Sequence, residues 1–87
     1  MVYVDALVET IPGKRWPYKK ACHLLADSDD ELHAAAQAIG LKRAWFQTST
    51  LHHYDLTASK RKLALEQGAT EVDRKWIAHR VRHKRAP

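Results

Sequence analysis

Residues 21–40, ACHLLADSDDELHAAAQAIG, predict a strand that is followed directly by a helix. The apolar run at 21–26 is typical of a strand that is buried on at least one face. Ser28 with Glu31 three residues later forms a capping box, and the acids around them suit the positive end of a helix dipole. The apolar residues that follow keep the spacing of one helix face: Leu32, Ala35, Ala36 and Ile39. Gly40 then ends the helix.

Strands and helices alternate on both sides of this unit. The sequence predicts strands at 2–4, 41–47 and 69–72, a helix at about 57–67 and a last helix from about residue 73. A loop is predicted at 9–20, where two prolines and a glycine break regular structure. The order β-loop-β-α-β-α-β-α is typical of α/β proteins. We therefore expect one domain over residues 1–87, with a mostly parallel four-stranded sheet and helices packed on it. The direction of the first strand stays open, because no helix joins it to the second.

Composition indicates a small globular protein. The 87 residues suffice for one domain, and the 45% hydrophobic content is ordinary for a folded chain. There is no run of about 18 apolar residues, so no membrane span is expected. The first ten residues have no basic segment ahead of an apolar one, so no secretory leader is expected. The single cysteine, Cys22, cannot form an internal disulfide. These features predict a reduced, cytoplasmic protein.

The positive charge is concentrated at the C-terminal end. Residues 1–73 hold nine Lys/Arg against ten Asp/Glu, whereas residues 74–87 hold six Lys/Arg and no acid. One interpretation is a basic helix or tail that contacts nucleic acid, with Trp76 able to stack on a base. The cations assigned to that contact are Arg80, Arg82, Lys84 and Arg85. The alternative is a solvated helix face with no binding role.

The polar loop and helix start at 45–61, WFQTSTLHHYDLTASKR, carry the groups that suit an anion. Lys60 and Arg61 fall in the first turn of the expected helix, where cations oppose the dipole. A local rule that is broken without an obvious gain points to function. An anion at this helix start would bind the free backbone N–H groups and both cations, which predicts a phosphate or nucleotide-type ligand. We expect further ligand contacts from Gln47, Tyr54 and Arg15. The alternative is that Asp55 simply pairs with Lys60 or Arg61.

Histidines near the same loop predict acid–base chemistry. His53, oriented by Asp55, is the first candidate, since an imidazole gives and takes protons near neutral pH. His23 is the second candidate, and two histidines beside one phosphate would support metal-free phosphodiester or phosphoryl chemistry. The alternatives are a solvated loop histidine at 53 and a hydrogen-bonded core histidine at 23. The spacing of the histidines and Cys22 matches no standard zinc pattern, so no metal or other cofactor is expected.

Several short motifs together resemble a family of small bacterial and phage proteins that is catalogued as a domain of unknown function. They are VYVD at 2–5, RWP at 15–17, ACHLLAD at 21–27, ELHA at 31–34, IGLKRAWFQ at 39–47, HYDLT at 53–57, KR at 60–61 and GA at 68–69. The family has no assigned activity, so the resemblance implies no reaction. It implies a bacterial or phage origin and a shared pattern that includes the histidines at 23 and 53. The resemblance also implies that several relatives carry a further acid after VYVD where this chain has Ala6-Leu7, which argues against a metal role for Asp5.

A third class of function stays open beside the anion site and the nucleic-acid arm. In a chain that resembles phage proteins, the polar loop at 48–55 would suit contact with a host protein. The sequence therefore predicts a phosphate-containing small molecule or nucleic acid as ligand, with a protein partner as the alternative and no membrane association.

Overall fold

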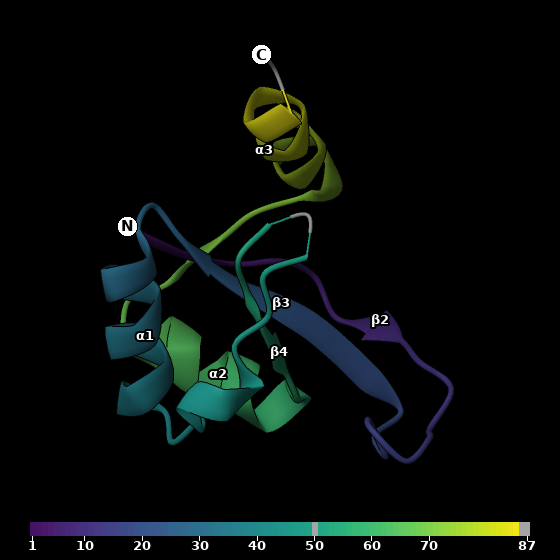
Figure 1. The fold of residues 1–87 in the computed structure, drawn as a ribbon. Coiled ribbons are helices and arrows are strands. Elements are labelled where there is room, and N and C mark those ends of the chain that lie inside the picture. Colours follow the sequence, from purple (N-terminus) through teal and green to yellow (C-terminus); the bar gives the residue numbers. More distant parts are fainter. Residues whose placement is uncertain (50, 86–87) are drawn as a thin grey trace.

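The computed structural model describes residues 1–49 and 51–85, and the side chains of these residues as far as residue 81. Over this part the chain forms, in order, β1 (Val2–Val4), β2 (Val8–Glu9), β3 (Lys20–Ala26), α1 (Asp29–Ala38), the 3-10 turn η1 (Arg43–Trp45), β4 (Tyr54–Leu56), α2 (Ala58–Glu66), β5 (Thr70–Glu71) and α3 (Arg74–Arg85) (Figure 1). The expected small α/β domain is confirmed.

The sheet is mixed and has five strands in the described residues, so the predicted mostly parallel four-stranded sheet is wrong. The long strand β3 is its centre. β1 and β2 pair antiparallel along one edge of β3, and β4 pairs antiparallel along the other. Only β5 is parallel to its neighbour, β1. The physical reason is the connections: the chain turns back from β2 to β3 through a Pro/Gly loop, and a second loop returns it to β3 as β4.

The predicted strand at 41–47 is also wrong. Residues 43–45 form η1, the Trp45 side chain is 50% exposed, and only Gln47 makes a bridge, with both backbone bonds to His53 at 2.9 Å. The strand forms instead at Tyr54–Leu56, at the end of the predicted loop, where two buried apolar residues flank Asp55. The apolar residues of 41–47 wrap around the end of α1 rather than alternate between two faces. A three-residue strand is too short to show a clear period in the sequence.

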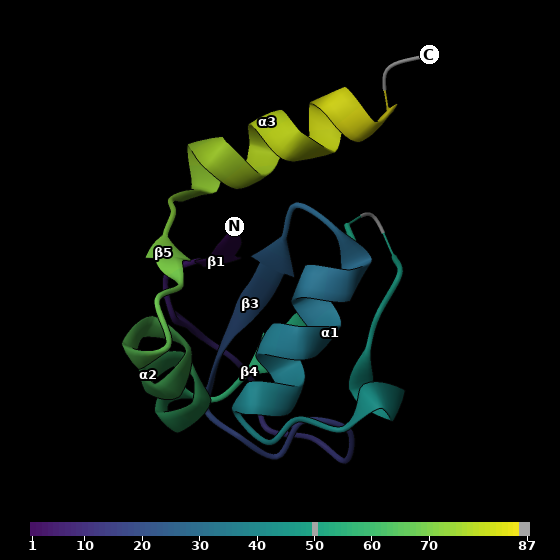
Figure 2. The same ribbon diagram turned by 90° about the vertical axis from the view of Figure 1, so that its left-hand side faces the viewer.

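The main core lies between the sheet and the helices α1 and α2, which cover the same face (Figure 2). From the sheet it contains Val4, Cys22, Leu24, Tyr54 and Leu56, and from the helices Leu32, Ala36, Ile39 and Ala64. The predicted capping box is confirmed, because the Glu31 backbone N–H donates to Ser28 Oγ at 3.2 Å. Gly40 ends the first helix with a φ of 83°, a conformation that glycine adopts without strain.

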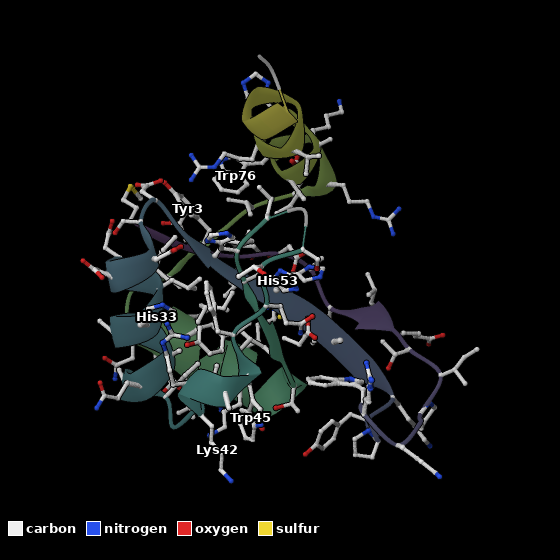
Figure 3. The ribbon with its side chains drawn as sticks, viewed as in Figure 1. Tyr3, His33, Lys42, Trp45, His53 and Trp76 are labelled. Atoms are coloured by element: carbon white, nitrogen blue, oxygen red, sulfur yellow. The ribbon has the colours of Figure 1, made fainter. Side chains whose placement is uncertain are left out.

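The last helix, α3, crosses the end of the sheet where β1 begins (Figure 2). Its first turn is capped by Asp73, whose side chain accepts the Trp76 backbone N–H at 2.9 Å. Trp76 packs on Tyr3 of β1 with ring centroids 4.4 Å apart (Figure 3). The predicted C-terminal helix is therefore confirmed, and an aromatic contact holds it against the sheet. Within the described residues, none of the helices is long and apolar enough to cross a membrane.

Candidate functional site

Two histidines and a carboxylate meet on the sheet face opposite α1 and α2. His23 on β3 is the cross-strand partner of Asp55 on β4, and His53 lies two residues before Asp55. Side chains two apart on an extended chain share a face, so all three project together. One ligand-type atom from each lies within 4.8 Å of the other two. The structure thus brings together the three residues that the sequence singled out for catalysis, and we call them the His/Asp cluster.

Asp5 holds His23 in place. Its carboxylate accepts the His23 backbone N–H at 2.6 Å and the ring Nδ1–H at 2.7 Å. Asp5 directly follows β1, in the segment between β1 and β2. Its side-chain oxygen accepts the His23 backbone N–H in place of a backbone carbonyl. The sequence did not predict Asp5 as the partner of His23. Its signal was an acid directly after the β-branched run of the first strand.

The contact between His23 and Asp5 changes the pKa of both groups. The hydrogen bond to Asp5 raises the pKa of His23 above its ordinary value of 6.5, although burial acts in the opposite direction. Burial by itself raises the pKa of Asp5, but the hydrogen bonds from the His23 ring and backbone lower it more, so the net pKa is below the ordinary 3.8. Both shifts favour the ion pair.

This ion pair should stabilise the fold only within a pH window. The raised pKa of His23 means that its contribution is complete below about pH 6.5 and disappears as the pH rises through the folded-state pKa. The lowered pKa of Asp5 means that its contribution is complete above about pH 3.8 and disappears as the pH falls. Urea unfolding of wild type and His23→Gln should therefore differ most between these limits. A difference that is constant from pH 3 to pH 9 would contradict the pairing.

Asp55 lies beside the Nε2 atoms of the two imidazole rings, which pack edge to face with their centroids 5.0 Å apart. Its Oδ1 atom is 3.6 Å from His53 Nε2 and 4.0 Å from His23 Nε2. Its Oδ2 atom accepts a short hydrogen bond from the Gln47 side-chain amide. On the far side of its ring, His53 Nδ1–H donates to the Leu51 carbonyl at 2.7 Å. Gln47 therefore fixes Asp55, rather than reaching into the cavity to orient a ligand as the sequence suggested.

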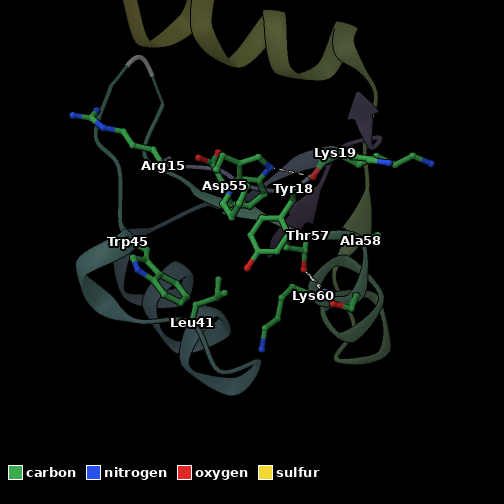
Figure 4. Close-up of a pocket in the computed structure, with 13 residues that line it drawn as sticks. Arg15, Tyr18, Lys19, Leu41, Trp45, Asp55, Thr57, Ala58 and Lys60 are labelled. Atoms are coloured by element: carbon green, nitrogen blue, oxygen red, sulfur yellow. Dashed lines mark hydrogen bonds between the residues drawn. The ribbon is translucent and has the colours of Figure 1, made fainter. Parts of the chain in front are cut away.

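A cavity of about 800 Å³ opens beside the first turn of α2 (Figure 4). Much of its wall is apolar or aromatic, from Trp16, Tyr18, Leu41 and Trp45. Cationic residues also line it, namely Arg15, Lys19, Lys20 and Lys60. Asp55 lines the same cavity, so the His/Asp cluster lies at its edge. The cavity therefore offers both flat apolar surfaces and positive charge.

Residues 2–84 match a protein family whose description reads "Protein of unknown function (DUF4031)". The chain belongs to the DUF4031 family. The resemblance to a family of unknown function is thereby confirmed. No curated protein and no solved structure matches the chain. The description of the DUF4031 family names no activity, so its function has to be inferred from the geometry of the site.

In this DUF4031 protein, the two cations of the helix start have separate contacts. Lys60 Nζ donates to the Ile39 carbonyl at 2.7 Å, where a cation suits the negative end of α1. Arg61 Nε donates to the Asp5 carbonyl at 2.8 Å, and its guanidinium pairs with Glu71 at 2.9 Å. Of these two cations, Lys60 lines the cavity and Arg61 is not among the lining residues. The packing of α2 against α1 and β1 thus largely explains why two cations occupy the first turn of α2, where they oppose the helix dipole. The alternative pairing of Asp55 with either cation is not found among the described ion pairs.

Three side chains close to the His/Asp cluster in the sequence of this DUF4031 chain have their contacts elsewhere: Tyr54, Cys22 and His52. Tyr54 is 1% exposed and its hydroxyl meets His33 Nδ1 at 2.9 Å, so it is a core residue rather than a ligand contact. Burial raises the pKa of the Cys22 thiol to about 12, and the side chain lies in the core beneath the sheet. His52 Nδ1–H donates to the Asp29 carboxylate at 2.8 Å.

The C-terminal cations are only partly described. The Arg80 guanidinium donates to Asp27 at 2.9 Å and lies over the rings of Tyr3 and Trp76, with centroid distances of 5.5 and 4.7 Å. Arg80 therefore helps to dock α3 on the sheet of this DUF4031 domain. The side chains of the other proposed nucleic-acid contacts lie outside the described residues: Arg82, Lys84 and Arg85.

Proposed function

We propose that this domain binds a nucleotide-type phosphate ligand in the cavity beside α2 and that the His/Asp cluster is its reaction centre. The observation that carries the proposal is the position of Asp55. This carboxylate is part of the cavity wall and also has an oxygen within 4.0 Å of the Nε2 atoms of both His23 and His53. A ligand that fills the cavity would therefore place its polar end at Asp55, next to the two imidazoles.

The lining of the cavity favours a nucleotide over inorganic phosphate. Trp16 and Tyr18 pack edge to face with ring centroids 5.0 Å apart, and Trp45 lies half-exposed across the cavity. An aromatic side chain stacks on any nucleobase, and such stacking contributes about 1–3 kcal/mol per base. The cations of the lining would pair with the phosphate oxygens. Ala58 and Ser59, in the first turn of α2, line the cavity, and the backbone N–H groups at a helix start suit the same charge.

The His/Asp cluster supports proton transfer in the metal-free protein. Each ring is fixed on its Nδ1 side, His23 by Asp5 and His53 by the Leu51 carbonyl, so each presents Nε2 to the cluster. Ligand-type atoms within 4.8 Å of one another can reach neighbouring oxygens of a single phosphate group. One imidazole would accept a proton from an attacking hydroxyl or water while the other donates a proton to the leaving oxygen. This places phosphodiester cleavage or phosphoryl transfer among the reactions to test.

Thermal unfolding in EDTA tests the ligand without any contribution from metal ions. AMP at 100 times its Kd should add about 2.7 kcal/mol to the free energy of unfolding. In a domain of this size the midpoint should rise by about 10–20 °C. At the same concentration as AMP, adenosine and inorganic phosphate should each raise the unfolding midpoint less, because each fills only one half of the cavity. DNA and RNA oligonucleotides are included in the same screen.

Matched variants locate the binding site. Arg15→Ala/Lys60→Met removes two cations that line the cavity, whereas Lys14→Ala/Lys62→Met removes two exposed cations outside the lining. The first pair should weaken AMP binding and the second should leave it unchanged. Equal losses in both pairs would indicate only a general charge effect and would contradict the proposed cavity site. Stabilisation by oligonucleotides alone, unchanged in Arg15→Ala/Lys60→Met, would favour binding by the C-terminal cations instead.

The remaining alternatives stay predictions. Nucleic-acid binding through the basic C-terminal segment gains no support from Arg80, which is engaged with Asp27. The protein-interaction role of the polar loop, the bacterial or phage origin and the cytoplasmic setting likewise stay predictions. A chain with residues 82, 84 and 85 changed to alanine keeps Arg80 and tests the nucleic-acid alternative without undocking α3.

A further inference from the structure

Both imidazole rings of the His/Asp cluster are fixed by oxygen atoms on their Nδ1 side. The distances are 2.7 Å from His23 Nδ1 to the Asp5 carboxylate and 2.7 Å from His53 Nδ1 to the Leu51 carbonyl. A carbonyl oxygen and an ionised carboxylate can only accept hydrogen bonds, so both Nδ1 atoms carry hydrogen. In a neutral imidazole the other nitrogen, Nε2, then keeps its lone pair.

Two such lone pairs face a carboxylate oxygen. His53 Nε2 is 3.6 Å and His23 Nε2 is 4.0 Å from Asp55 Oδ1. Three electron-pair donors gathered this closely repel one another unless a proton or a cation lies between them. We infer that His23, His53 and Asp55 bind one divalent first-row transition-metal ion such as Zn²⁺.

The distances in the cluster suit such an ion after a small adjustment. Tetrahedral zinc with ligands at about 2.0–2.2 Å holds its ligand atoms about 3.3–3.6 Å apart. The separations of 3.6 and 4.0 Å between Asp55 and the two rings are close to this range. Small rotations of side chains that are partly exposed would close the remaining gap.

Each ligand also has the outer partner that metal sites require. Asp5 holds His23, the Leu51 carbonyl holds His53, and the Gln47 amide holds the second oxygen of Asp55. A ligand histidine typically donates its other N–H to a carboxylate or a carbonyl, which fixes the ring and raises its basicity. Two imidazoles and one carboxylate favour Zn²⁺, Fe²⁺ or Co²⁺ over Mg²⁺ and Ca²⁺, which prefer oxygen ligands.

Three protein ligands leave one coordination position open, as in catalytic rather than structural zinc sites. Since Asp55 lines the cavity beside α2, the ion would sit at the cavity edge, within reach of a bound phosphate (Figure 4). The metal ion and the proton of the acid–base cluster compete for the same lone pairs, so the two forms exclude each other. The inference shares the His/Asp cluster with the proposed function and rests on it in that respect alone. Metal binding itself needs no nucleotide in the cavity.

Titration of EDTA-treated, dialysed protein with Zn²⁺ and Co²⁺ tests this site. Calorimetry should give one Zn²⁺ per chain, and the Co²⁺ form should show the visible bands of a low-symmetry site. Long-range ¹⁵N NMR should show that both histidines bind through Nε2. Asp55→Asn keeps the shape of the ligand, and His53→Gln fills much of the space of the ring. Each should weaken Zn²⁺ binding by about 100-fold or more, beyond the 10–100-fold typical of losing an outer partner.

His52→Ala is the matched control, because this neighbouring histidine contacts Asp29 on α1 instead of the cluster. Its Zn²⁺ affinity should equal that of wild type. The inference is overturned if wild type binds no Zn²⁺ at micromolar concentration, or if His52→Ala loses as much affinity as His53→Gln. Nucleotide titrations in EDTA report separately on the cavity, so failure of the metal site and failure of the nucleotide site give different patterns.

Discussion

Replacing Leu24 by alanine should lower the free energy of unfolding by about 2–5 kcal/mol. Leu24 is 0% exposed and lies at the middle of β3, the strand against which both α1 and α2 pack. The substitution removes buried methyl groups and leaves a cavity that the surrounding sheet cannot close. Small domains have only about 0.05–0.15 kcal/mol of stability per residue, so this loss would be a large part of the total. Urea unfolding followed by circular dichroism measures it.

Leu63→Ala is the control for this prediction. Leu63 lies on α2 with 41% of its surface exposed, so the same chemical change removes little buried area. Surface substitutions usually change stability by less than about 0.5 kcal/mol, and alanine is the better helix former. Equal losses for the two leucines would show that the core does not lie between β3 and the helices.

Replacing Asp5 by asparagine should disable the His/Asp cluster without removing any of its members. The backbone N–H of His23 would keep the amide oxygen as its acceptor, which turns the amide NH₂ group toward the ring Nδ1. Nδ1 then has to accept a hydrogen bond, so the ring hydrogen moves to Nε2 and blocks the lone pair. We expect about 10–100-fold weaker Zn²⁺ binding and a lower pKa for His23. Loss of the charged hydrogen bonds should also cost about 1.5–3 kcal/mol of stability.

The His23 tautomer is the decisive measurement for this variant, since destabilisation alone would also follow from a purely structural role. Long-range ¹⁵N NMR distinguishes hydrogen on Nδ1 from hydrogen on Nε2. Glu9→Gln on β2 removes a nearby exposed acid and should change neither the tautomer nor the Zn²⁺ affinity. A ring that keeps its hydrogen on Nδ1 after Asp5→Asn, with undiminished affinity, would show that Asp5 does not set the cluster.

Local signals in the sequence were sufficient to predict those features that depend on residues close together in the chain. The capping box at Ser28, the glycine after the first helix and the apolar run of β3 all describe interactions within a few residues, and all were predicted correctly. The predicted trio of His23, His53 and Asp55 also came together. Their meeting did not follow from the predicted topology, because the strand that carries Asp55 was expected to be a loop.

The failed predictions depend on contacts between distant segments. Lys60 breaks the dipole rule of its own helix, but the sequence cannot show that the end of α1 lies beside it and accepts its charge. Arg61 is likewise held by the Asp5 carbonyl, far away in the chain. Strand direction failed for a similar reason, since alternation of strands and helices implies parallel pairing only when the chain enters the next strand directly from the end of the helix. Here η1 and a loop follow α1 before the chain enters β4, and β4 runs antiparallel to β3.

The pairing of β1 has a consequence for the order in which the molecule assembles. β1 meets β3 through the segment 5–19, which contains β2, but its other edge pairs with β5, so that Tyr3 lies beside Thr70. Contacts between residues so far apart in sequence form late, because closing a long loop costs entropy before the contact rewards it. The His/Asp cluster and Asp5 come from β1 to β4 alone. We therefore expect the groups of the site to be in place before β5 and α3 complete the sheet edge, with final closure setting the folding rate rather than the geometry of the site.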